Sequence, residues 1–98
     1  MSQVILVVNI KVKEEFTDEL YSFMKALHKL THELDEGFIQ YDLHKVKEKE
    51  NEFCFVETWE NQEFLDQHMA KDHFKNYMEF TDGKFEDIQI NFLDKYAE

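Results

Sequence analysis

The chain has 98 residues and a net charge of −11, with 22 acidic residues, 11 lysines and no arginine. Nucleic acids and anionic membranes bind through clustered basic residues, so this charge predicts neither as a partner. A chain of this length has room for one domain with a modest core, and we expect residues 1–98 to form a single domain.

The sequence has one cysteine, Cys54, so no disulfide can form within the chain. Its apolar neighbours favour a small buried thiol over a reactive one. The N-terminus lacks a basic segment followed by a long apolar run, and no window approaches the ~20 apolar residues of a membrane span. We therefore expect a cytoplasmic protein.

The first predicted element is a strand over residues 4–12. One face carries a row of aliphatic side chains, and Ile5 and Val7 make the other face apolar over its first half. Such a strand needs cover on both sides, and so short a chain supplies helices for one side only. The second cover is expected to be the sheet of a partner subunit, which predicts a homodimer.

The remaining elements follow from spacing. A helix is expected from Phe16 to Leu34 and is ended by a turn at Gly37. Its apolar face is predicted from residues at spacings of four and three, namely Phe16, Leu20, Phe23, Leu27, Leu30 and Leu34. Alternating segments predict strands over 38–46 and 53–59, joined by a solvated hairpin. Two helices, over 62–70 and 72–80, are expected to be capped by Asn61 and Asp72, and a last strand covers about 86–93. This β-α-β-β-α-β order predicts a ferredoxin-like α+β fold, a four-stranded antiparallel sheet with helices on one face.

The most informative segment is the corner between the third strand and the next helix. Alternation places Glu57 and Trp59 on the same strand face as Phe53 and Phe55. The spacing of Phe64, Leu65, His68 and Met69 places His68 on the apolar stripe of the helix. Glu57, Trp59 and His68 can therefore line one cavity between sheet and helix.

These residues resemble the antibiotic biosynthesis monooxygenase domain family, which consists of small dimeric ferredoxin-like proteins and includes quinol monooxygenases. The matching pieces cover about the middle half of the chain, and Asn9 in the first strand extends the likeness. They are Glu36-Gly37 with Tyr41 and Leu43, then Glu57-Thr58-Trp59, then Leu65 and His68, then Asp72-His73-Phe74.

Each candidate has a structural alternative. His68 is either a base or a structural histidine, and the resemblance implies that it lines the active cavity. Glu57 can act as a base, orient His68 or bind a substrate hydroxyl, or it can pair with a lysine on a neighbouring strand. The resemblance implies that Asn9 binds a substrate oxygen or dioxygen, although it can also mark where the strand reaches the surface.

Further residues are expected at the ligand. Trp59, Tyr41 and Leu65 are the predicted substrate contacts, with core packing as the alternative for the two aromatic residues. His73 is expected to be exposed or to cap a helix. His28 and His32 lie one helical turn apart, a spacing that can chelate zinc, but no third ligand is fixed nearby, and we predict no metal site.

The resemblance implies a cofactor-independent monooxygenase that oxidises a quinol or polyphenol with dioxygen. Such an enzyme needs a base, hydrogen-bond donors and an aromatic pocket, and no metal, flavin or haem. The alternatives are an isomerase of a small carbonyl metabolite and a non-catalytic ligand-binding dimer. Haem degradation is disfavoured, because the family's iron-ligating histidine aligns near Tyr77 or Met78.

Overall fold

The computed structural model describes residues 2–97. Within this range the chain forms a βαββαβ arrangement in which the second helical unit is split in two. The elements are β1 (Val4–Val12), a short 3-10 turn (Glu14–Phe16), α1 (Thr17–Leu34), β2 (Phe38–Lys45), β3 (Glu52–Trp59), α2 (Gln62–Ala70), α3 (Asp72–Thr81) and β4 (Phe85–Leu93). The predicted boundaries agree to within one or two residues.

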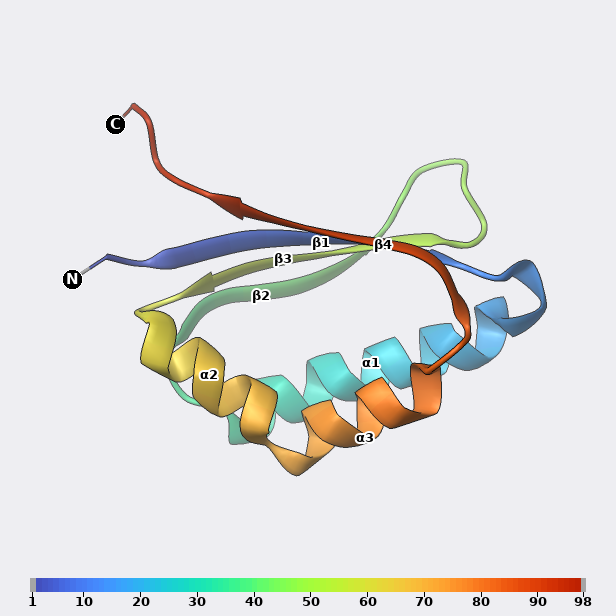
Figure 1. Cartoon of the computed structure of the whole chain (residues 1–98), viewed down its shortest axis with the longest axis horizontal. Coiled ribbons are helices and arrows are strands. Elements are labelled where there is room, and N and C mark those ends of the chain that lie inside the picture. Colours follow the sequence, from blue (N-terminus) through green and yellow to red (C-terminus); the bar gives the residue numbers. More distant parts are fainter. Residues whose placement is uncertain (1, 98) are drawn as a thin grey trace.

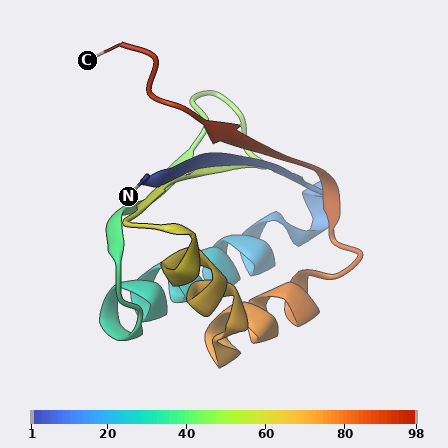
Figure 2. The same cartoon turned by 60° about the vertical axis from the view of Figure 1, so that its left-hand side comes forward.

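The strands form one antiparallel sheet in the order β2-β3-β1-β4. Helices α1, α2 and α3 all lie on the same side of it, while the other side carries no helix (Figures 1 and 2). This is the ferredoxin-like α+β fold expected from the order of the elements. It leaves β2 and β4 as the two edges of the sheet.

The core lies between the sheet and the helices. From the sheet it takes Leu6, Ile10, Val12, Tyr41, Phe53, Phe55 and Trp59, and from the helices it takes Leu20, Met24, Leu27, Leu65 and Tyr77. The stripe predicted for α1 was wrong in detail, because Met24 and Thr31 are buried while Leu34 is 55% exposed. α1 is thus rotated so that Phe23 reaches α3, where it stacks on Phe80.

Local signals explain where the elements begin and turn. Asn61 caps α2 as expected, since its side-chain oxygen accepts a hydrogen bond from the backbone N–H of Phe64 at 3.1 Å. The cap predicted at Asp72 was wrong, because α3 already begins there and Lys71 is the N-cap residue. Gly37 has φ +81°, and a Cβ there would lie 2.1 Å from the ring of Phe64. Only glycine fits this turn.

The helix-free side of the sheet is partly apolar. Ile5 and Val7 of β1 are half-buried, and Val7 pairs with Val56 of β3. Leu93 of β4 is opposite Ile5 and is 47% exposed. Within residues 2–97, no helix combines the length and apolar character needed to cross a membrane.

Candidate functional site

A cavity of about 120 Å³ lies between the helix-covered face of the sheet and helices α2 and α3. Its walls are almost wholly apolar, and the ionisable groups among the lining residues are Glu57, His68 and two tyrosines. Exposed side chains among the lining residues form its mouth, and they are Met69, Met78, Ile88 and Ile90. A small apolar ligand can therefore enter from the side of β4.

Glu57 lies on the sheet wall of this cavity, opposite Leu6 of β1 and Tyr41 of β2. It is 6% exposed, and its Oε1 accepts a hydrogen bond from Trp59 Nε1 at 3.0 Å. Burial raises the pKa of Glu57 to about 7, while the bond from Trp59 opposes that rise. Near neutral pH this carboxyl group can therefore either accept or donate a proton.

His68 lies on the helix wall and is held by Asp35, the residue that follows α1. Nδ1 of His68 forms a buried hydrogen bond with Oδ2 of Asp35. A carboxylate can only accept, so Nδ1 carries the proton and Nε2 keeps a free lone pair. Burial lowers the pKa of His68, whereas Asp35 raises it. The imidazole of His68 is therefore neutral and held in one orientation, and Asp35 stabilises its charged form when it takes up a proton.

His73 belongs to the same buried group, although the sequence indicated exposure or helix capping. Its side chain is 8% exposed, and Nε2 lies 2.7 Å from Oδ1 of Asp35. The geometry does not meet that of a hydrogen bond, so the two atoms make a close polar contact. Asp35 thus contacts both imidazoles with its two oxygens, and we call Asp35, His68 and His73 the buried cluster.

The predicted substrate contacts divide into two groups. Tyr41 and Leu65 line the cavity, with exposed fractions of 2% and 3%. Trp59 is fully buried in the core and is not among the lining residues, which agrees with the core packing given as its alternative role. It bonds to Glu57, and its ring lies 4.8 Å from that of His68. Trp59 therefore acts on the cavity through the two titratable groups.

Asn9 does not share the cavity, and this expectation was wrong. It is exposed and pairs with Cys54 and Gln89 on the helix-free side of the sheet. Leu6, Val8 and Ile10, its even-numbered neighbours, line the cavity instead. The two-residue alternation of a strand forces this outcome, because odd and even positions face opposite sides.

Two residues of the site were missed from the sequence. Asp35 follows a helix and carries no motif, so only the fold reveals that its carboxylate is 1% exposed and lies between two histidines. Tyr77 of α3 lines the cavity, and its hydroxyl finds no partner within the described chain. Burial raises the pKa of Tyr77, so the hydroxyl stays protonated and can donate to a ligand. Its spacing from Phe74 and Thr81 was the available signal.

The buried cluster also offers three atoms of metal-ligand type within 4.8 Å of one another. However, the oxygens of Asp35 already face the nitrogens of His68 and His73 at contact distance. A metal ion needs about 2 Å on either side, which such close contacts do not leave. The hydrogen bond between Asp35 and His68 can instead carry a proton.

Comparison with known proteins places this geometry in context. The family model described as antibiotic biosynthesis monooxygenase matches residues 3–79. No curated protein matches the chain.

Solved structures share the whole fold. PA3566 from Pseudomonas aeruginosa has a TM-score of 0.90 at 22% identity, covering 99% of this chain and 97% of its own. A conserved protein from Methanosarcina mazei Go1 has a TM-score of 0.86 at 28% identity, covering 98% and 95%. An antibiotic biosynthesis monooxygenase has a TM-score of 0.88 at 21% identity, covering 96% and 99%.

Proposed function

Because the chain belongs to the antibiotic biosynthesis monooxygenase family, we propose that it is a cofactor-independent monooxygenase that oxidises a quinol-type aromatic substrate with dioxygen. The observation that carries this proposal is an apolar cavity whose wall holds a neutral imidazole fixed by a buried carboxylate. An enclosed apolar cavity of about 150 Å³ accepts benzene, and this cavity of about 120 Å³ is of comparable size and open at its mouth, so a single aromatic ring can occupy it with its substituents at the mouth.

The proposed base is His68. Its Nε2 lone pair is free, and Asp35 stabilises the imidazolium that forms when the substrate hydroxyl is deprotonated. Asp35 is a positioning residue, since it acts through the imidazole. The resulting quinolate is electron-rich, and an apolar cavity does not stabilise its charge as water does, which favours electron transfer to dioxygen.

The overall reaction balances without any other reductant. A quinol and one dioxygen molecule give a hydroxyquinone and one water. The substrate loses four electrons, two from its hydroxyl groups and two from the ring carbon that gains oxygen. One oxygen atom forms the new C–O bond, and the other leaves as water after the O–O bond breaks. The imidazolium of His68 returns the proton that the leaving oxygen requires.

Glu57 and Tyr77 are proposed to orient the substrate oxygens. Glu57 carries a proton part of the time at neutral pH, and the Tyr77 hydroxyl is protonated and unpartnered within the described residues. Both can donate to an oxygen that gains negative charge. No lysine is among the lining residues, so a phosphorylated substrate lacks a counter-charge there.

The proposal includes a homodimer formed through the helix-free side of the sheet. Ile5, Val7 and Leu93 supply apolar area on that side. Burying apolar area contributes about 25 cal/mol per Å² before the cost of association. Light scattering should return twice the 12.0 kDa chain mass at micromolar concentration, and a stable monomer would refute this part.

The function is tested by oxygen uptake with methylhydroquinone under labelled dioxygen. The wild-type protein should insert one labelled oxygen per ring, whereas spontaneous oxidation yields unlabelled quinone. His68→Ala should lower turnover by about two to four orders of magnitude. His44→Ala, an exposed histidine of β2, should match the wild type. Equal rates for His68→Ala and wild type, or quinone without label, would refute the proposal.

A further inference from the structure

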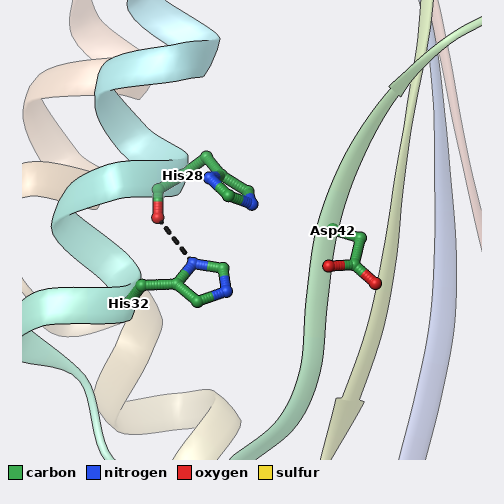
Figure 3. Close-up of side chains that lie close together, drawn as sticks. All are labelled: His28, His32 and Asp42. Atoms are coloured by element: carbon green, nitrogen blue, oxygen red, sulfur yellow. Dashed lines mark hydrogen bonds between the residues drawn. The ribbon is translucent and has the colours of Figure 1, made fainter.

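A second set of two histidines and one aspartate lies outside the cavity, where α1 packs beside the edge strand β2. His28 and His32 extend from successive turns of α1 toward the strand that carries Asp42 (Figure 3). One ligand atom from each residue lies within 4.8 Å of the other two. The sequence indicated a solvated histidine pair with no third ligand fixed nearby, and the fold corrects the second point, because it brings Asp42 to the pair.

We propose that His28, His32 and Asp42, here called the edge cluster, bind one divalent transition-metal ion such as Zn²⁺. Two imidazole nitrogens and one carboxylate oxygen form a donor set that suits Zn²⁺, Cu²⁺ and Ni²⁺ and is poor for Ca²⁺ or Mg²⁺. Three protein ligands leave a coordination position for water.

The histidine pair is already arranged as metal-binding histidines usually are. Nδ1 of His32 donates a hydrogen bond to the backbone oxygen of His28 at 2.9 Å, drawn dashed in Figure 3. A carbonyl only accepts, so Nδ1 holds the proton and Nε2 offers its lone pair. Metal-bound imidazoles commonly donate their second nitrogen to a backbone oxygen in this way. The tautomer is therefore fixed for binding through Nε2.

The surroundings hold the other two ligands in place. Gln40 donates to Oδ2 of Asp42 at 2.9 Å, which leaves Oδ1 free. The ring of His32 packs edge-on against Phe38 at 4.9 Å, and the two imidazole centroids lie 4.2 Å apart.

Partial exposure makes the edge cluster accessible. His32 is exposed, whereas His28 and Asp42 are half-buried. The net charge of −11 also draws cations to the protein. An ion here would join α1 to β2, the two elements whose connection carries Asp35.

The test is a zinc titration of tag-free chain that has first been stripped with a chelator, in competition with a chromophoric chelator. One Zn²⁺ per chain should bind. His28→Ala and His32→Ala should each weaken binding by more than about 100-fold, since loss of a residue that only orients a ligand already costs 10–100-fold. Gln40→Ala should weaken it by about 10-fold. His44→Ala should leave it unchanged, because that exposed histidine is outside the cluster.

Ring resonances of the histidines locate the ion independently of affinity. Sub-stoichiometric Zn²⁺ should shift the signals of His28 and His32 and leave those of His68 and His73 in place. Circular dichroism confirms that each variant is folded, which alanine within a helix favours. Undiminished binding by His32→Ala, or loss of binding in His73→Gln with the edge cluster intact, would refute the proposal. Absence of stoichiometric binding to the wild type would do the same.

Discussion

The buried cluster and the edge cluster have the same composition, two histidines and one aspartate, and Asp35 of the buried cluster lies in the connection between α1 and β2, the two elements that carry the edge cluster. In the buried cluster the Asp35 side chain is 1% exposed and directly contacts both imidazoles. In the edge cluster, Asp42 is half-buried and accepts a hydrogen bond from Gln40 instead of contacting an imidazole directly. Residue type is shared, but spacing and solvation are not.

This difference determines which chemistry each cluster supports. In the buried cluster, the direct contact between Asp35 and His68 leaves room for a proton only. Because water is excluded there, the Asp35 carboxylate is the group that stabilises a positive charge on the imidazole. In the edge cluster, the wider spacing beside solvent leaves room for a cation. Without a cation, the interactions among His28, His32 and Asp42 are weak, because solvent screens them. Matched substitutions in the two clusters therefore separate the effect of burial from that of residue type.

The largest difference in the free energy of unfolding is expected between Asp35→Ala and Asp42→Ala, both measured in metal-free protein. Removing Asp35 leaves the buried Nδ1–H of His68 without its acceptor, and a buried donor left without a partner costs about 1–3 kcal/mol. Removing Asp42 should change the free energy of unfolding by less than about 0.5 kcal/mol. Urea unfolding of both variants at pH 7 measures the difference. Similar losses would mean that burial does not distinguish the clusters.

The fold could be predicted because its signals are local. Alternation of apolar residues predicts the strands. Asn61 predicts the start of α2, which it caps, and Gly37 predicts the turn before β2, where its φ is positive. Alternation also placed Glu57 and Tyr41 on the side of the sheet that the helices cover. It equally places Asn9 on the other side, in conflict with the cavity role that the family resemblance implies. A strand's period is the stronger evidence, because it is fixed by backbone geometry.

The partners of the histidines could not be predicted, because they are far away in sequence. Asp35 meets His68 across 33 residues, and Asp42 joins His28 and His32 only after β2 turns back beside α1. Neither aspartate belongs to a spacing motif. Local patterns can show that a histidine is on an apolar or a solvated face, but the carboxylate that completes each cluster is supplied by tertiary packing.

A pH profile should sharpen the contrast at Glu57. The pKa of Glu57 is about 7 in the folded chain and near 4.5 when unfolded. Between these values the folded chain holds a proton that the unfolded chain has lost, so raising the pH through this window destabilises the fold. The loss is at most about 3 kcal/mol and is complete above pH 7.

Glu57→Gln removes this titration while keeping an acceptor for Trp59. Its free energy of unfolding should equal that of the wild type near pH 4 and exceed it at pH 8. The lowered pKa of His68 makes the fold more stable as the pH rises, which is the opposite dependence. Both proteins share this effect, so subtracting the wild-type profile from that of Glu57→Gln removes most of it. Asp42→Asn should shift the profile by less than about 0.5 kcal/mol, because solvent screens that carboxylate. Parallel profiles for Glu57→Gln and wild type would contradict the raised pKa.

The smallest effect concerns one N–H donor to a carboxylate in each region. Trp59 Nε1 donates to Glu57 at 3.0 Å and Gln40 Nε2 donates to Asp42 at 2.9 Å, so length does not distinguish the two bonds. Trp59→Phe removes the buried donor and some volume. Only the donor's contribution depends on the charge of Glu57, since bonds to charged groups are stronger than neutral ones by about 1 kcal/mol.

Unfolding of Trp59→Phe at pH 5 and pH 8 therefore isolates the hydrogen bond from the lost packing. The destabilisation should be greater at pH 8 by about 1 kcal/mol, because Glu57 is then ionised and its oxygen is left unpaired in an apolar cavity. Gln40→Ala should cost less than about 0.5 kcal/mol at both values, since water replaces the lost donor on Asp42. If the penalty of Trp59→Phe were the same at both pH values, Trp59 would stabilise the core by packing alone, and its bond would not tune Glu57.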